Sequence, residues 1–133
     1  MAVQEAHDEF RANLRHLAEE KIKPHAAAVD DEAAFPTASI AAFKAMGLNG
    51  LPFPEEFGGG DGDLLSQVIA VEEIARVCGS SALVLFIPWA ALTPLVWFGD
   101  DVLKKKVVPP IAAGQAGASF CLTELVAKQV CGD

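Results

Sequence analysis

Basic residues are scarce in this sequence of 133 residues. It holds 10 Lys and Arg against 18 Asp and Glu, which gives a formal net charge of −8. The one basic run is residues 104–106, and three lysines near a helix end are typical of a solvated face. Because contacts to phosphates need clustered Lys and Arg, this balance argues against nucleic acid as a partner.

Cysteine and histidine are also few, and their spacing fits no metal site. The sequence has no CxxC pair, and no histidine cluster accompanies the cysteines. The residues concerned are Cys78, Cys121 and Cys131, and His7, His16 and His25. An odd number of cysteines without a secretory leader predicts reduced thiols and a cytoplasmic protein.

The amino terminus lacks the apolar core of a signal peptide. Its first 15 residues carry Glu5, Asp8 and Glu9 instead. The apolar share of 52% and the charged share of 21% predict a folded chain rather than a disordered one.

One stretch has no charged residue, so it could be either a core helix of a soluble protein or a membrane segment. Residues 82–98 (ALVLFIPWAALTPLVWF) contain no ionisable side chain. A membrane-spanning helix needs about 20 apolar residues, and this run is shorter and interrupted by Pro88 and Pro94. A buried core helix is the favoured interpretation, and a membrane segment remains the alternative.

Apolar spacing and capping signals predict a mainly α protein. Helices are expected over residues 10–22, 37–46, 64–78, 80–98 and 100–108. Pro24 is expected to interrupt the first helix, which can resume for one or two turns after it. The last is expected to stop at Pro109 and Pro110, and residues 116–123 are long enough for one strand. The predicted fold is an orthogonal or up-down helical bundle over residues 1–114, followed by the start of a β-domain over residues 115–133.

The helix over residues 64–78 carries a continuous apolar stripe. This stripe is predicted to face the core, and Glu72, Glu73 and Arg76 are predicted to lie toward the wet side, where Glu72 and Arg76 can pair across one helical turn. Its members are Leu64, Val68, Val71, Ala75 and Cys78. Leu65, Ile69 and Ile74 broaden the stripe, so the helix is expected to be covered on more than one side.

A succession of short motifs carries a family resemblance. They are residues 22–26 (IKPHA), 35–36 (FP), 46–48 (MGL), 54–59 (PEEFGG), 72–76 (EEIAR), a Gly99 followed by lysines and Pro110, residues 113–114 (AG) and residues 120–124 (FCLTE). In this order, they resemble the amino-terminal half of acyl-CoA dehydrogenases over nearly the whole chain.

The resemblance implies a fold and a chemistry. Such enzymes have a helical amino-terminal domain, a middle β-barrel-like domain and a carboxy-terminal helical domain, usually in a homotetramer. They bind FAD and oxidise an acyl-CoA thioester to the 2-enoyl-CoA, with a glutamate base in the carboxy-terminal domain. Electrons then pass to an electron-transferring flavoprotein. The protein positions the flavin and the thioester and excludes water from them.

Two sets of binding residues follow from the resemblance. In the family's (Y/F)-x-(V/L)-T-E stretch the strand contacts the flavin, so Phe120 and Leu122 are expected beside the ring, with Thr123 as a hydroxyl donor. An ordinary strand residue is the alternative for Thr123. Ile87, Ala91 and Leu95 recur every four residues and are candidates to line the acyl tail, with plain core packing as the alternative.

The match stops after Glu124. The family continues with Pro, small residues and Gly-Ser-Asp, whereas residues 125–133 read LVAKQVCGD. We therefore expect a version cut off where flavin binding begins, for instance by a shifted reading frame. It would have no catalytic residue of its own, would be inactive alone and would tend to self-associate. A non-enzymatic helical module and a small membrane-attached protein are the alternatives.

Overall fold

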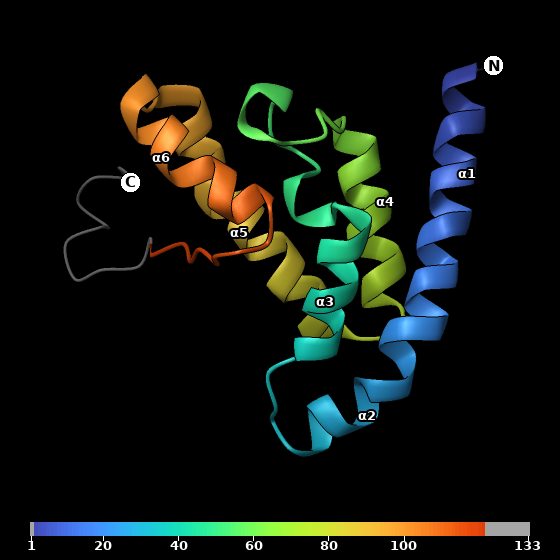
Figure 1. Cartoon of the computed structure of the whole chain (residues 1–133). Helices are drawn as coiled ribbons and strands as arrows, with labels where there is room; N and C mark the ends of the chain where they lie inside the picture. The colour runs from blue at the N-terminus through green and yellow to red at the C-terminus, as the bar shows by residue number, and fades with distance from the viewer. Residues whose placement is uncertain (1, 122–133) are drawn as a thin grey trace, which may run out of the picture.

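The structure, a computed structural model, describes residues 2–121, and this part consists of helices and turns (Figure 1). The helices are α1 (Ala2–Leu17), α2 (Lys23–Asp31), α3 (Thr37–Met46), α4 (Leu64–Ala75), α5 (Gly79–Phe98) and α6 (Asp101–Ala112). A π-helical turn, Ala18–Ile22, joins α1 to α2, and two short 3-10 turns, Leu48–Gly50 and Glu55–Phe57, lie between α3 and α4. The prediction of a mainly α fold is confirmed.

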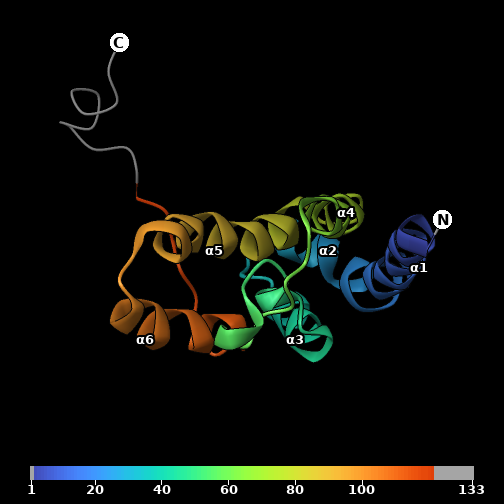
Figure 2. The ribbon, with the colours of Figure 1, turned by 90° about the horizontal axis from the view of Figure 1, so that it is seen from above.

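The helices form two layers (Figure 2). In one layer α4 and α5 lie side by side, and in the other α3 and α6 both pack against α5. The amino-terminal helix α1 packs against α4 at the end of the layers. A core of buried apolar side chains fills the space between the layers, and its largest fully buried members include Phe43, Phe53, Leu14 and Ile22.

A π-helical turn keeps Ile22 on the buried face of the first helix. In this turn the Lys23 N–H donates to the carbonyl of Ala18, five residues earlier. The wider turn returns every fourth or fifth residue to the same face, and Leu14, Ala18 and Ile22 are all fully buried. Pro24 then lies in the first turn of α2, where its missing N–H costs little. The chain therefore stays helical through Pro24, so the predicted interruption there was wrong, while the predicted further turns are present and extend to Asp31.

The predicted end of the last helix was wrong. Instead of stopping at Pro109, α6 continues to Ala112. The two prolines lack donors but keep their carbonyls, and Pro109 accepts from the Ala113 N–H while Pro110 accepts from the Gln115 N–H. Burial of Ile111 and Ala112 in the core stabilises this last turn.

The predicted core face of α4 was right only for Ile69, Ile74 and Cys78, which are buried. Leu64 and Val68 are 74% and 53% exposed, whereas Ile69, Ala70 and Ile74 are buried. Eight of its 12 residues are apolar and they lie on several sides, so its periodicity does not select one side. The helix also ends at Ala75, and Cys78 adopts an extended conformation before α5.

The predicted strand falls at the edge of the described residues. Residues 117–121 have neither helix nor strand pairing, because a strand needs a neighbour and residues 2–121 offer none. The remainder of the predicted strand, and the domain beginning at residue 115, lie mostly outside the described residues, so the domain division stays a prediction.

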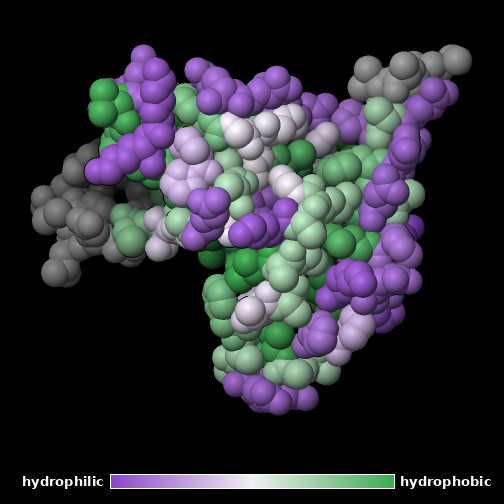
Figure 3. Space-filling view, in the orientation of Figure 1, coloured by the Kyte–Doolittle hydropathy of each residue, from purple (hydrophilic) through white to green (hydrophobic). Residues whose placement is uncertain are grey.

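The hydrophilic side chains gather along α1 and around the end of α2 on the face shown in Figure 3. Acidic residues are frequent there, and residues 30–32 at the end of α2 read DDE. Polar side chains on this side agree with an outer surface in contact with water.

Candidate functional site

The motif PEEFGG at residues 54–59 has a structural role. Phe57 is buried, and Gly58 adopts a φ of +80°, a conformation that glycine adopts most readily. A Cβ on Gly59 would lie 1.9 Å from the carbonyl oxygen of Phe53, so only glycine fits there. The two glycines therefore let the loop fold back on itself between α3 and α4.

The amino-terminal part of α5 is fixed by a buried polar cluster. The hydroxyl groups of Ser39 and Ser81 lie 2.8 Å apart, and Ser81 also donates to the sulfur of Cys78 at 3.0 Å. All three side chains are buried. The cluster joins α3 to the start of α5 and so sets the direction in which α5 runs.

The middle of α5 is fixed by Trp89. Its indole N–H donates to the backbone carbonyl of Asn49 at 3.0 Å, and the side chain is 2% exposed. The bond ties α5 to the 3-10 turn Leu48–Gly50, whose position depends on the loop described above. One side of α5 is therefore held firmly against the body of the domain.

The opposite side of α5 carries two of the predicted acyl-tail residues. Ile87 is 37% exposed and Ala91 is half-buried, and both point away from the core side of the helix. Leu95 also packs against the edge of the core. The structure thus places Ile87 and Ala91 on one open strip and turns Leu95 partly inward.

An apolar groove runs beside this strip, between α4 and α5. It has a volume of about 290 Å³ and an almost entirely apolar wall. Its lining residues are Leu64, Gln67, Val68, Val71, Glu72, Phe86 and Trp89. Sequence reasoning missed the groove because it assigned Leu64 and Val68 to the core.

The carboxylate of Glu73 is the most perturbed acid among the described residues. It is 1% exposed and accepts from Arg15 at 2.8 and 2.9 Å and from Arg11 at 2.8 Å. The two guanidinium groups, Arg15 foremost, lower the pKa of Glu73 to about 2 against the opposing effect of burial. This acid is ionised and fully paired, so it holds α1 to α4 rather than carrying protons.

The neighbouring ion pairs differ from the predicted one. Glu72 binds Arg11 at 2.6 Å, and Arg76 binds Glu19 at 2.7 Å, so the predicted pair between Glu72 and Arg76 is wrong. Lys23 and Arg76 together lower the pKa of Glu19. Sequence reasoning placed Glu73 on the wet side of the helix, because a helical period cannot show that arginines of α1 reach over it.

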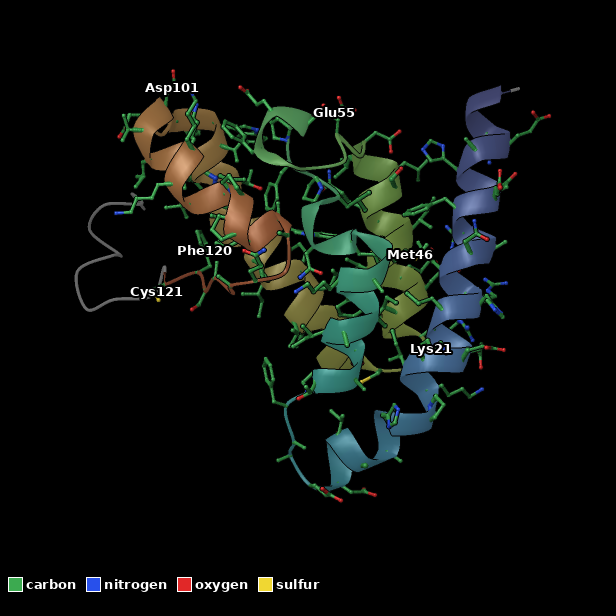
Figure 4. The ribbon with its side chains drawn as sticks, in the orientation of Figure 1. Lys21, Met46, Glu55, Asp101, Phe120 and Cys121 are labelled. Atoms are coloured by element: carbon green, nitrogen blue, oxygen red, sulfur yellow. The ribbon has the colours of Figure 1, made fainter. Side chains whose placement is uncertain are left out.

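The predicted flavin residues lie mainly outside the described residues. Phe120 is 51% exposed and sits with Cys121 at the far end of the segment that leaves α6, away from α1 (Figure 4). Leu122 and Thr123 are not among the described residues. Within residues 2–121 no group of His, Cys, Asp and Glu is arranged to hold a metal ion.

The helix α5 also has the length and composition of a membrane span. It is the one helix of the described part with this property, with 20 residues and a mean hydropathy of 1.8, and 28% of its most apolar stretch is buried in the domain. The buried residues, Leu85 and Trp89 among them, are held in the core of the bundle.

Comparison with known proteins identifies the same family as the sequence motifs. The family model described as "Acyl-CoA dehydrogenase, N-terminal domain" matches residues 4–115. A protein of Mycobacterium leprae named as a probable acyl-CoA dehydrogenase is 43% identical over 120 residues, which are 90% of this chain and 31% of the relative. The chain thus spans about a third of that relative's length.

Solved structures show the same fold. The butyryl-CoA dehydrogenase of Megasphaera elsdenii superposes with a TM-score of 0.80 at 29% identity, over 92% of this chain and 33% of the other. An acyl-CoA dehydrogenase of Bacillus anthracis, solved in complex with FAD, superposes with a TM-score of 0.80 at 26% identity, over 91% of this chain and 21% of the other.

Proposed function

The chain belongs to the acyl-CoA dehydrogenase family, and from that premise we propose that it forms the helical part of a flavoprotein that oxidises an acyl-CoA thioester to the 2-enoyl-CoA. The observation that carries the proposal is the match of residues 4–115 to the family's amino-terminal domain, in sequence and in fold. The role assigned to this part is to shape the site for the acyl tail.

We assign the acyl tail to the open strip of α5. Ile87 and Ala91 lie on this strip, and Leu95 continues it at the edge of the core. Residues 82–98 contain no ionisable side chain, so they can exclude water but cannot remove a proton. The catalytic base is therefore proposed to lie outside the described residues, and this chain on its own is proposed to be inactive.

FAD is the proposed cofactor. Phe120 offers an aromatic ring that is half exposed, and residues 115–121 carry no charge that would oppose a flavin ring. These features fit the ring of the flavin, and Leu122 and Thr123 are proposed to contact it as well. When bound, FAD would accept the hydride from the acyl group, while the protein positions the two.

Family membership also suggests partners and a location. We propose acyl-CoA as the substrate and an electron-transferring flavoprotein as the electron acceptor, in the cytoplasm. The thiols of Cys78 and Cys121 are both unpaired in the structure, which agrees with a reducing compartment.

A domain exchange tests the proposal. Residues 4–115 would replace the matching third of the Mycobacterium leprae relative, and FAD content and acyl-CoA oxidation would be measured. We expect a yellow, active chimera in which Ile87→Asp raises the KM for acyl-CoA, whereas the same change at an exposed valine of α6, Val102→Asp, does not. A folded chimera that binds FAD but fails to oxidise any acyl-CoA would refute the proposed role.

The cofactor can be tested on the chain itself. FAD would be titrated into the 133-residue protein and followed by the quenching of flavin fluorescence. We expect binding that is weakened by Phe120→Ala and unchanged by Phe98→Ala, since Phe98 is an 83% exposed phenylalanine at the carboxyl end of α5. Equal effects of the two substitutions would contradict the assignment of Phe120.

A further inference from the structure

Asn49 is followed by Gly50, and such a pair is chemically labile in a flexible chain. The backbone nitrogen of Gly50 can attack the side-chain carbonyl carbon of Asn49, because glycine has no Cβ to hinder the approach. The sequence has one other asparagine, Asn13, and the bulky Leu14 follows it. Asn49 is therefore the asparagine of this sequence that loses its amide more readily when the chain is free to move.

The packing of the fold favours glycine at position 50. A Cβ there would lie 3.1 Å from the carbonyl oxygen of Ala112 and 3.2 Å from that of Gly58. Both oxygens belong to the backbone, so neither can swing aside as the end of a flexible side chain would. The close approach of α6 and the loop to the 3-10 turn Leu48–Gly50 therefore accounts for a glycine after Asn49.

In the folded chain, the same turn holds Gly50 away from the reaction. The Gly50 N–H donates to the carbonyl of Gly47 at 3.3 Å. The Gly50 carbonyl accepts from the N–H groups of Phe53 and Gly60, each at 3.0 Å. Ring closure requires the Gly50 nitrogen to turn toward the Cβ of Asn49, which the backbone angles of a 3-10 turn do not allow. The folded turn therefore protects Asn49.

Asn49 is itself fixed at its carbonyl and at its amide. The backbone carbonyl accepts from the indole N–H of Trp89 at 3.0 Å. The amide packs against Gly114, where a Cβ would lie 3.2 Å from the Cγ and Nδ2 atoms of Asn49. The Oδ1 atom is shielded from solvent and has no hydrogen-bond partner in the part of the chain that the structure describes. A carboxylate at this position would be a shielded charge without a donor, which disfavours the folded turn.

We propose that Asn49 is a modification site that loses its amide only when the turn Leu48–Gly50 opens. The Gly50 nitrogen then forms a bond to Cγ of Asn49, the bond from Cγ to Nδ2 breaks, and ammonia leaves with the proton of the Gly50 N–H. Water opens the resulting succinimide to aspartate, or to isoaspartate, in which the main chain runs through Cβ and Cγ. Isoaspartate lengthens the main chain beside the carbonyl that Trp89 binds, so the modified turn no longer holds α5 through this bond. The reaction does not depend on flavin or acyl-CoA binding.

Peptide mapping by mass spectrometry tests the site. The 133-residue chain would be kept at mildly alkaline pH, in native buffer and in concentrated guanidinium chloride. We expect Asn49 to convert at least about tenfold faster in the denatured chain, because opening of the native turn costs free energy. Asn13 is the internal control, and in the denatured chain it should convert more slowly than Asn49 because Leu14 hinders the attack.

The two tryptophans of α5 give a matched pair of variants. Trp89→Phe removes the N–H that holds the Asn49 carbonyl and should speed conversion in native buffer at least about fivefold. Trp97→Phe makes the same change at a residue that is 70% exposed and should leave the rate unchanged. The comparison of native and denatured wild type needs no variant to fold.

The converted chain should also be less stable. After conversion in denaturant and refolding, it should unfold at a lower urea concentration than the freshly prepared chain. Asn49→Asp introduces the charge without the longer main chain, and its midpoint of urea unfolding should lie between the two.

Four results would overturn the proposal. The first is an equal rate at Asn49 in native buffer and in denaturant, and the second is an equal rate at Asn13 and Asn49 in the denatured chain. The third is an equal effect of Trp89→Phe and Trp97→Phe on the rate in native buffer. The fourth is a midpoint of urea unfolding that conversion leaves unchanged.

Discussion

Replacing Glu73 by Gln tests whether the buried carboxylate holds α1 to α4. The pKa of Glu73 falls from 4.5 to about 2 on folding. At about 1.4 kcal/mol per pKa unit, the ionised side chain stabilises the fold by about 3 kcal/mol at neutral pH. Glutamine keeps the shape but not the charge, so the free energy of unfolding should drop by about this amount at pH 7, and the Tm by roughly 10 °C.

The pH dependence of this difference follows from the sign of the shift. Because the folded pKa lies below the unfolded value, the contribution is fully present above about pH 4.5 and is lost as the pH falls through about 2. The wild type and Glu73→Gln should therefore converge in stability near pH 2. The lowered pKa values of Glu19 and Asp63 act equally in both proteins and cancel in the difference.

Glu72→Gln is the matched control. The substitution removes the same charge at the adjacent residue and breaks a 2.6 Å bond to Arg11, but the Glu72 side chain is 60% exposed. Exposed ion pairs contribute about 0–1 kcal/mol, so the control should lose under 1 kcal/mol. Urea unfolding followed by circular dichroism at pH 7 and pH 2.5 measures both. Equal losses in the two variants, or a loss in Glu73→Gln that does not change with pH, would refute the reasoning.

Two further substitutions probe the loop and its contact with α5. Gly59→Ala places a Cβ 1.9 Å from the Phe53 carbonyl oxygen and should lower the free energy of unfolding by about 3 kcal/mol or more. The control Gly60→Ala meets only ordinary contacts and should lower it by under about 1 kcal/mol. Equal midpoints of urea unfolding for the two variants would contradict this. Trp89→Phe leaves the Asn49 carbonyl without its donor and should cost about 1–3 kcal/mol in urea unfolding, and no measurable loss would mean that the bond does not hold α5 in place.

The elements that the sequence predicted best have strong local signals. The helix α3 was predicted at residues 37–46, where it lies, because Gly47 ends it in the left-handed conformation with a φ of 72°. The start of α6 follows Asp100, whose side chain accepts from the Leu103 N–H at 2.9 Å. Such caps depend on residues within one turn and can be predicted without knowledge of the rest of the fold.

The features that the sequence did not predict depend on distant contacts. The burial of Glu73 requires Arg11 and Arg15, about 60 residues earlier in the chain. The exposed position of Leu64 and Val68 depends on which side of a helix with apolar residues on several sides meets the core. In both cases the local pattern permits either orientation, and tertiary packing selects one.

The candidate site was predicted in part. The four-residue spacing predicted that Ile87 and Ala91 share one side of α5. In the structure this side faces away from the core. The spacing could not show that Leu95 turns toward the core or that the groove beside the strip is formed by α4. The assignment of these residues to the acyl tail stays a prediction, as does that of Phe120 to the flavin.

One side of α5 lies uncovered by the other described helices. A helix that is apolar all round requires cover on every side, either from protein or from lipid. Within α5, Pro88 and Pro94 have no N–H to donate to the carbonyls of Val84 and Ala90. A lone helix surrounded by hydrocarbon has no neighbour to satisfy such carbonyls, whereas a protein surface can bring donors or water to them. The composition of α5 is therefore better suited to a protein cover than to a bilayer.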